Sequence, residues 1–202
     1  MRRHLVVMIK EPRAGRVKTR LGRDIGVTQA AWWFRHQSAA LLRRLHDPRW
    51  NLVLAVTPDG AVTSPIWPAH LPRLAQGRGD LGQRMARLMR DMPPGPVCIV
   101  GADIPALGAE HVAEAFAALG RNDAVFGPAP DGGFWLVGLK RIARPPARLF
   151  TGVRWSSAHA LSDSLASLAG ARVACITRLR DVDTAADLHH VSRPVKVLPF
   201  LT

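Results

Sequence analysis

The sequence predicts an α/β fold: a mostly parallel sheet with helices on both faces. Short apolar runs of strand length alternate with longer segments of helical periodicity, and this alternation is typical of parallel strands joined by crossover helices. The chain has 202 residues, which corresponds to about one domain, so we expect a single domain over residues 1–202. Hydrophobic residues make up 48% of the chain and charged residues 21%, which indicates a globular rather than a disordered protein.

The N-terminal half begins with a strand that is followed by a long loop. Residues 10–26 are interrupted by Pro and Gly and are predicted to be loop. Thr28 is expected to cap a helix to about His46, and Asp80 to cap one to about Met92. The predicted strands of this half are Leu5–Ile9, Asn51–Thr57, a short strand near Leu74, and Pro96–Val100.

The C-terminal half continues the alternation. The predicted strands are Asp123–Phe126, Gly133–Leu139 and Arg172–Thr177. The predicted helices are Ala109–Leu119, a helix capped by Ser156 or Ser157 that ends near Ala169, and Thr184–His190. The apolar run 195–200 is expected to form either an edge strand or a contact between two copies of the chain.

Charge and apolar patterning limit the class of partner. The formal net charge is +13, but the arginines are scattered and do not alternate with aromatic residues, which does not favour nucleic-acid binding. An anionic small molecule fits the charge equally well. No apolar run reaches the length of about 18 residues of a membrane span, and the first apolar stretch is too short for a signal peptide, so we expect a cytoplasmic protein. Cys98 and Cys175 lie in apolar runs and are expected to be buried, reduced thiols.

The loop after the first strand carries several cations. In a parallel α/β sheet, ligands bind beyond the carboxyl ends of the strands. Lys10, Arg16, Lys18 and Arg20 crowd this loop, and Gly15 allows the backbone to approach a ligand. These residues are suited to neutralising a di- or triphosphate, although the P-loop pattern GxxxxGK[ST] is absent. A solvated basic loop is the alternative.

Two aspartates follow later strands and are candidate metal ligands. Asp103 comes directly after an apolar strand, and a carboxylate there is a suitable anchor for Mg²⁺ or Mn²⁺. Asp183 could supply a second ligand. The alternative for Asp103 is a turn or a helix cap. Thr184 and Asp187 resemble a capping box, which does not exclude a ligand role for Asp183.

Two further segments suit a substrate pocket. Asp131 could act as a base, and Gly132 with Gly133 would allow close backbone contact with a ligand, although Asp-Gly is also a common turn. Trp155, just before two serines, is the tryptophan best placed for a ligand. The glycine-rich turn 76–82 is suited to holding a base or a ribose.

Six segments together resemble a known family. In order they are KEPRAGRVKTRL, QGRGDLGQRM, GADIPAL, GPAPDGGFWLVGL, RWSS and RDVDTAADL. They resemble the bacterial GT-A-like transferases labelled radical-SAM/selenodomain-associated transferase 1, from about Leu5 to about Leu188. This family is similar to nucleotide-sugar transferases and to nucleotidyltransferases such as the molybdopterin-guanine and 2-phospholactate guanylyl enzymes. The resemblance implies a single-domain, Rossmann-like GT-A fold.

The resemblance also implies roles for individual residues. Arg16, Lys18 and Arg20 would handle phosphates, Gln76 and Asp80 would lie near the nucleoside, Asp103 and Asp183 would hold the metal, and Asp131, Gly132 and Gly133 would line the acceptor or sugar pocket with Trp155 and Ser156. Where the family often has Trp-Ser-Thr, this chain has Trp-Ser-Ser and keeps the hydroxyl. Asp103 stands alone rather than in the Asp-x-Asp of many glycosyltransferases, which is closer to nucleotidyltransferases.

Three functions follow as hypotheses. The first is glycosyl transfer from a nucleoside diphosphate sugar to a small acceptor, with Mg²⁺ or Mn²⁺ as cofactor and with Lys18, Asp103 and Asp131 as catalytic residues. The second is nucleotidyl transfer from a nucleoside triphosphate to a phosphorylated small molecule. The third is a protein without catalysis, either a binder of nucleic acid or another polyanion, or a family member that binds a regulator.

Overall fold

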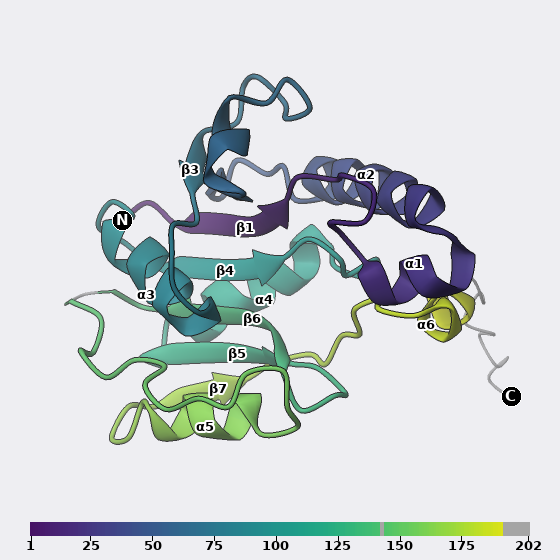
Figure 1. Ribbon diagram of the computed structural model, residues 1–202. Coiled ribbons are helices and arrows are strands. Elements are labelled where there is room, and N and C mark those ends of the chain that lie inside the picture. Colours follow the sequence, from purple (N-terminus) through teal and green to yellow (C-terminus); the bar gives the residue numbers. More distant parts are fainter. Residues whose placement is uncertain (142–143, 192–202) are drawn as a thin grey trace, which may run out of the picture.

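A seven-stranded sheet forms the centre of the computed structural model, which describes residues 1–141 and 144–191. The strand order is β3-β2-β1-β4-β6-β5-β7. The bounds are β1 His4–Lys10, β2 Asn51–Thr57, β3 Arg73–Ala75, β4 Val97–Gly101, β5 Ala124–Pro128, β6 Phe134–Leu139 and β7 Val173–Cys175. Only β6 runs antiparallel to its neighbours, β4 and β5, and the other pairs are parallel (Figure 1). The predicted mostly parallel sheet is therefore confirmed.

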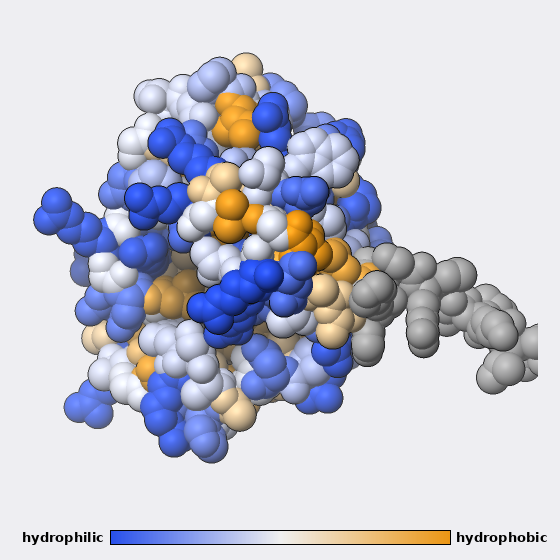
Figure 2. Space-filling model, turned by 45° about the vertical axis from the view of Figure 1, so that its right-hand side comes forward, coloured by the Kyte–Doolittle hydropathy of each residue, from blue (hydrophilic) through white to orange (hydrophobic). Residues whose placement is uncertain are grey.

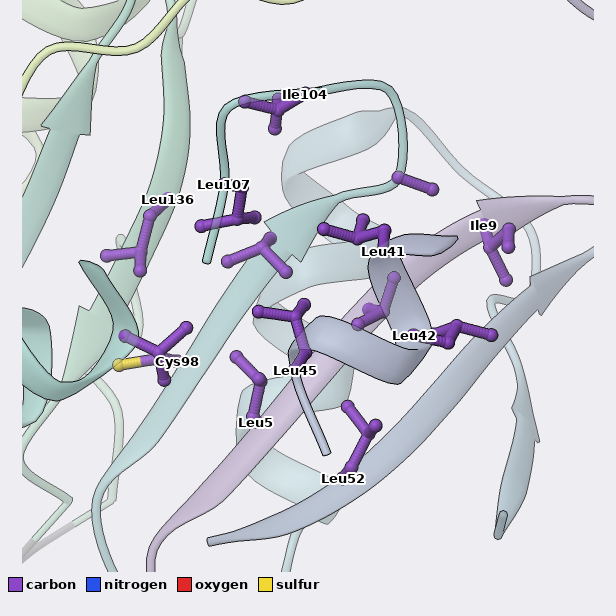
Figure 3. Packing of buried hydrophobic residues seen from close by; sticks show 14 of the residues in the cluster. Leu5, Ile9, Leu41, Leu42, Leu45, Leu52, Cys98, Ile104, Leu107 and Leu136 are labelled. Carbon is purple, nitrogen blue, oxygen red and sulfur yellow. The ribbon is translucent and has the colours of Figure 1, made fainter. Parts of the chain in front are cut away.

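Helices cover both faces of the sheet, as predicted. The bounds are α1 Thr19–Ile25, α2 Val27–Arg44, α3 Leu81–Asp91, α4 Ala109–Ala118, α5 Ala160–Ala166 and α6 Ala185–Val191, with a 3₁₀ helix at Asp59–Thr63. Leu5, Val7 and Ile9 of β1 pack on one face with α2 and α4 (Figure 3). Val6 points to the opposite face, where side chains of α3 and α5 cover the sheet. This alternation follows from the two-residue side-chain period of a strand.

Helix α1 is absent from the prediction, which placed loop over residues 10–26. Gly22 has a low helix propensity and therefore signals a loop, yet it is buried inside α1. A Cβ at Gly22 would lie 3.3 Å from the Cα of Val27, so the missing side chain lets α1 pack closely against the start of α2. Helix α2 begins at Val27 with Gly26 as its N-cap, and Thr28 lies inside the helix rather than at its cap.

Helix α5 also differs from the prediction. It begins at Ala160 after His159, not after a serine cap, and it ends at Ala166 rather than near Ala169. The Ser157 hydroxyl instead closes a turn: it donates to the carbonyl of Arg154 at 2.7 Å and accepts from the backbone N–H of His159 at 3.2 Å. A serine in a tight turn and a serine at an N-cap carry the same sequence signal. The run 195–200 lies outside the described residues.

The face that carries α1, α2 and α6 is mainly hydrophilic. Small apolar patches on it are separated by hydrophilic side chains (Figure 2). Within residues 1–141 and 144–191, no helix is both long and apolar enough to cross a membrane.

The two cysteines differ in exposure, which corrects the expectation that both are buried. Cys98 is buried in β4, and burial raises the pKa of its thiol, whereas Cys175 at the end of β7 is exposed. Because the thiolate is the reactive form, we expect a disulfide reagent to modify one thiol rapidly in the folded protein and two after denaturation. Loss of the rapid phase in the Cys175→Ser variant would assign the rapidly modified thiol to Cys175. Two rapid thiols in the folded protein would contradict the burial of Cys98.

Candidate active site

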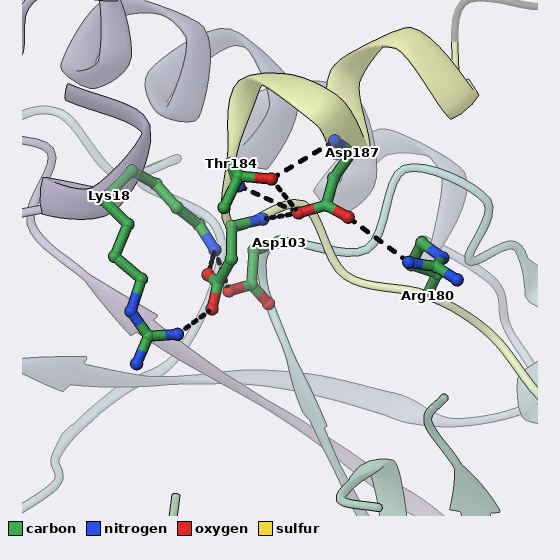
Figure 4. Close-up of polar contacts among 7 residues, drawn as sticks. Lys18, Asp103, Arg180, Thr184 and Asp187 are labelled. Atoms are coloured by element: carbon green, nitrogen blue, oxygen red, sulfur yellow. Dashed lines mark hydrogen bonds and ion pairs between the residues drawn. The ribbon is translucent and has the colours of Figure 1, made fainter. Parts of the chain in front are cut away.

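Lys18 lies at the centre of the polar cluster and joins residues far apart in the sequence. Its ammonium donates to Asp103 Oδ2 at 2.5 Å and to Asp183 Oδ1 at 2.7 Å, across 85 and 165 residues (Figure 4). The side chain is only 6% exposed. Burial alone would lower the Lys18 pKa, but the carboxylates of Asp103 and Asp183 hold it above its ordinary value. Lys18 therefore stays charged and paired.

The backbone positions Lys18 in an unusual conformation. Lys18 is the N-cap of α1 and has φ 45°, ψ 48°. A left-handed conformation is uncommon for a residue with a side chain, and such residues gather at functional sites.

The end of β4 and the segment before α6 bring the carboxylates to Lys18. Asp103 lies two residues after the end of β4, and its carbonyl accepts from the backbone N–H of Val182 at 3.1 Å. The loop beyond it is held by Arg44 of α2, which donates to the carbonyls of Pro105 and Leu107 at 3.0 and 3.1 Å. Arg20 adds a second cation, donating to Asp183 Oδ2 at 3.2 Å.

Asp187 fixes the backbone at Asp183. Its Oδ2 accepts from the backbone N–H groups of Asp183 and Thr184 at 3.1 and 2.9 Å, and from the Thr184 hydroxyl at 2.8 Å (Figure 4). Burial opposes the charge, but these hydrogen bonds hold the pKa of Asp187 below its ordinary value. The predicted Thr184–Asp187 cap is present, and it orients Asp183 toward Lys18.

Asp181 is a third carboxylate that the sequence reasoning did not assign. Oxygen atoms of Asp103, Asp181 and Asp183 all lie within 4.8 Å of one another. Burial and the charges of the other two aspartates raise the pKa of Asp181 to about 6. The spacing of Asp181 and Asp183 is the sequence signal that could have indicated this third carboxylate. Residues 177–183 are neither helix nor strand, and where such a segment is extended, residues two apart share a face.

The cluster suits a hard divalent cation. It offers three carboxylate groups, the oxygen donors that Mg²⁺ and Mn²⁺ prefer. Burial first, and then repulsion by Asp103 and Asp183, disfavour the charged form of Asp181 and raise its pKa. A divalent cation would stabilise that charged form.

A pocket of about 270 Å³ lies on the side of the cluster toward α1. It is lined by the basic side chains of Lys10, Arg16, Lys18 and Arg20, together with Asp103, Asp183 and a few neighbours. The structure thus brings the predicted phosphate-binding cations to the carboxylates. Gly15, in the same loop, has φ +72° and open space around it.

A second cavity of about 230 Å³ shares Asp103 with the first pocket and is also lined by Asp181. Its aromatic walls are Phe134, Trp135 and Trp155, and its polar residues include Asp103, Asp131, Ser156 and Asp181. Most of the predicted acceptor or sugar residues therefore share this cavity, with Gly133 among them and Gly132 between them in the chain.

Asp131 and Gly132 form a tight turn at the edge of this second cavity. Asp131 Oδ1 accepts from the backbone N–H of Gly133 at 2.9 Å. Gly132 has φ +85°, and a side chain there would collide with the backbone of Ala158. The turn, which was the alternative to a ligand role, is therefore present, and its position at the cavity leaves the ligand role a prediction.

We expect Gly132→Ala to destabilise the fold more than Gly15→Ala. Both sites have a positive φ, which costs a residue with a side chain about 1–2 kcal/mol, but only Gly132 also meets backbone atoms. The expected loss is about 2–4 kcal/mol for Gly132→Ala, adding local strain, and about 1 kcal/mol for Gly15→Ala. Urea unfolding measures both. Equal losses would contradict the close approach at Ala158.

Gln76 and Asp80 lie apart from the carboxylate cluster. The buried Gln76 amide donates to the carbonyls of Ala55 at 2.8 Å and Ile9 at 3.4 Å, so it ties the loop after β3 to β2 and β1. Asp80 forms a capping box with Gln83 at the start of α3, as predicted. Neither residue lines the two cavities described above.

Comparison with known proteins places this chain in a family. A family model described as DUF2064, an uncharacterized protein conserved in bacteria, matches residues 40–157. A protein of Desulfovibrio desulfuricans G20, provisionally named a nucleotide-diphospho-sugar transferase, is 32% identical, with a TM-score of 0.87, over 99% of this chain and 90% of that one. No functionally curated protein matches the sequence.

More distant structures share the fold alone. The 4-diphosphocytidyl-2C-methyl-D-erythritol synthase of Anaerococcus prevotii DSM 20548 is 10% identical, with a TM-score of 0.61, over 95% of this chain and 99% of that one. Rv0371c of Mycobacterium tuberculosis H37Rv, in a manganese complex, is 11% identical, with a TM-score of 0.51, over 95% and 98%. The predicted similarity to nucleotide-sugar transferase and nucleotidyltransferase structures is confirmed, and the chain belongs to the DUF2064 family.

Proposed function

We propose that this protein is a metal-dependent transferase that moves a sugar from a nucleoside diphosphate sugar to a small acceptor. The observation that carries the proposal is the carboxylate trio Asp103, Asp181 and Asp183, which lies between a cation-lined pocket and an aromatic cavity. The resemblance to the D. desulfuricans protein supports the same class of donor.

The cation-lined pocket is the proposed site of the donor diphosphate. Lys10, Arg16 and Arg20 line it along with Lys18, and charged groups of this kind form strong hydrogen bonds with phosphate oxygens. Asp103 and Asp183, with Asp181 added to the pair predicted from the sequence, would hold Mg²⁺ or Mn²⁺. That ion would supply charge neutralisation of the departing diphosphate.

Asp131 is the proposed proton acceptor for the attacking hydroxyl. One of its oxygens holds the turn at Gly133, and among the described residues its Oδ2 has no hydrogen-bond partner. Asp131 also lines the aromatic cavity, together with Ser156 and the proposed metal ligands Asp103 and Asp181. A carboxylate within hydrogen-bond reach of a bound hydroxyl can take its proton.

Nucleotidyl transfer is the second candidate, because the A. prevotii synthase has the same fold and because four cations suit a triphosphate. In that reaction a nucleophile attacks the α-phosphorus and pyrophosphate leaves. Lys18 and Arg20 would then hold the outer phosphates.

A thermal-shift screen separates the candidates. The panel is Mg²⁺ and Mn²⁺ with the common nucleoside triphosphates, diphosphates and diphosphate sugars. A ligand at 100 times its Kd stabilises a protein by about 2.7 kcal/mol, which shifts the Tm by a few degrees. A metal-dependent shift with one diphosphate sugar, larger than with its triphosphate, supports glycosyl transfer, and the reverse supports nucleotidyl transfer. No shift with any nucleotide, together with salt-sensitive binding of polyanions, would overturn both.

A further inference from the structure

The two cavities beside the carboxylate trio have opposite electrostatic character. The pocket toward α1 is lined by two lysines and two arginines. The aromatic cavity has Asp103, Asp131 and Asp181 in its wall and, among the described residues, no lysine or arginine. We propose that the aromatic cavity binds an uncharged, hydroxyl-bearing moiety and rejects a phosphorylated one. This rests on the proposed function and narrows its substrate class.

The charges around the aromatic cavity disfavour a phosphate. A metal bound by Asp103 and Asp181 would offset those two carboxylates, which leaves Asp131 as the charge of the outer wall. Arg154 precedes Trp155 in the chain, but its guanidinium is held by both carboxylate oxygens of Asp163, at 2.9 Å each. The positive charge of that metal would be shared with Asp183 and the donor diphosphate. A phosphate in this cavity would therefore face the like charge of Asp131 with no lysine or arginine among the described lining residues, which opposes binding.

Packed aromatic rings form part of the wall of the aromatic cavity. Trp155 contacts Phe134 and Phe150 edge-on, with ring centroids 6.2 and 5.9 Å apart. Trp155 packs directly against the backbone of α3 at Gly82. A Cβ at Gly82 would lie 2.7 Å from the indole ring, so only glycine leaves room for Trp155 in this position. These fixed aromatic surfaces offer an apolar wall to the carbon face of a ligand.

The size of the aromatic cavity and its hydrogen-bonding groups suit a small, hydroxyl-bearing ligand. The cavity of about 230 Å³ is smaller than the roughly 300–1,000 Å³ of sites for drug-sized molecules, so it suits a single small moiety. Among the described residues, Asp131 Oδ2 and the Ser156 hydroxyl make no hydrogen bond within the chain. They are suited to bind ligand hydroxyls, as polar groups orient ligands in apolar pockets.

The test compares matched neutral and phosphorylated probes. The protein is first loaded with Mn²⁺ and the nucleoside diphosphate that stabilises it most, so that a probe phosphate does not simply occupy the donor pocket. Glucose is then compared with glucose 6-phosphate, and glycerol with glycerol 3-phosphate, by tryptophan fluorescence. We expect the neutral member of each pair to bind at least about tenfold more tightly, given the cost of like charges, and Trp155→Phe to remove most of the fluorescence change.

A charge-reversal variant has a matched control outside the cavity. Asp131→Lys should reduce the preference for the neutral member by about tenfold or reverse it. Asp91→Lys makes the same change in net charge at the far end of α3, about 15 Å along the helix from Leu81, which lines the cavity. It should leave the preference unchanged.

The outcomes separate this inference from the proposed function. If no nucleoside diphosphate stabilises the protein with Mn²⁺, the proposed function fails. If a diphosphate binds but the phosphorylated probes bind as tightly as the neutral ones, or no neutral probe changes the fluorescence, the donor site stands and the assignment of the aromatic cavity is overturned. A preference for glucosamine over glucose of the same size would likewise overturn it, in favour of a cationic ligand.

Discussion

Asp103→Asn should abolish transfer and metal-dependent nucleotide binding while leaving the Tm of the metal-free protein nearly unchanged. Asn keeps the size of the side chain but removes the charge that faces Lys18, Asp181 and Asp183. Lys18 retains its contact with Asp183 at 2.7 Å, so the ammonium is not left unpaired. The loss of a carboxylate also relieves repulsion within the trio, which offsets the lost ion pair.

The expected loss of Mn²⁺ affinity is at least about a hundredfold. Removing a group that only hydrogen-bonds to a metal ligand costs about 10–100-fold, and Asp103 is proposed as a ligand itself. Isothermal titration with Mn²⁺ measures the affinity, and nucleotide release from the diphosphate sugar measures turnover. Asp47→Asn is the matched control, because Asp47 pairs with Arg49 outside the site. Wild-type Mn²⁺ affinity in Asp103→Asn would exclude Asp103 as a ligand.

The sheet could be predicted from the sequence because its signals are local. The apolar run at residues 51–57 is bounded by Asn at its start and followed by Pro-Asp-Gly, and β2 has these bounds in the structure. Helix α1 could not be predicted in this way. Its signal depends on Gly22 meeting Val27, a contact between two helices, and a glycine whose role is packing has the same local signal as a glycine in a loop.

Part of the site could also be predicted from the sequence, because a general rule of α/β folds says where its residues lie. The rule that ligands bind beyond the carboxyl ends of strands brings Lys18, Asp103 and Asp183 to one edge, and the structure has them in contact. The rule does not rank the residues that follow a strand, so it does not select Asp181, which is two residues from Asp183. Its burial among carboxylates, which raises its pKa, is a property of the assembled cluster.

Gln76 is a residue whose sequence signal fits two different structural roles. A glycine-rich turn before a helix suggests contact with a nucleoside, whereas in the structure the Gln76 amide nitrogen donates to the carbonyls of Ala55 and Ile9. The contact with a nucleoside stays a prediction. The turn itself is held from outside by Arg87, which donates to the carbonyls of Gln76 and Arg78 at 2.8 Å each. A buried amide that joins three strands and an amide that binds a base have the same sequence signature. Only the hydrogen-bond partners distinguish them.

Lys18→Met should raise the affinity for Mn²⁺ in the absence of nucleotide and lower turnover at the same time. The Lys18 ammonium contacts Asp103 and Asp183, two of the three proposed ligands, so it competes with a cation for their charge. Methionine keeps an unbranched, flexible side chain of similar length for packing but carries no charge. With the competing charge removed, Mn²⁺ should bind at least about tenfold more tightly, since adjacent unit charges interact by several kcal/mol near a protein surface.

The same substitution should lower the stability of the metal-free protein. Oxygen atoms of three carboxylates then lie within 4.8 Å of one another, and Arg20 is the one cation that contacts them among the described residues. Partly buried groups that lose a partner cost about 1–3 kcal/mol. Saturating Mn²⁺ should restore the Tm, because the cation replaces the lost charge. Turnover should not recover with it: a charged donor aimed at departing phosphates is worth about 10²–10³-fold in rate, and a metal bound by the carboxylates does not replace it.

Arg20→Met is the control that separates competition for the carboxylates from a general change in charge. Arg20 also carries one positive charge and contacts Asp183, at 3.2 Å, but its side chain is 70% exposed and makes no hydrogen bond to Asp103. Solvent screens such a pair, so its interaction is weak, and Mn²⁺ affinity should change by less than about threefold. If both variants raise the affinity equally, the effect belongs to net charge. If Lys18→Met lowers the affinity, the ammonium supports the metal-binding geometry of Asp103 and Asp183 rather than competing with the ion, and the proposed competition is overturned.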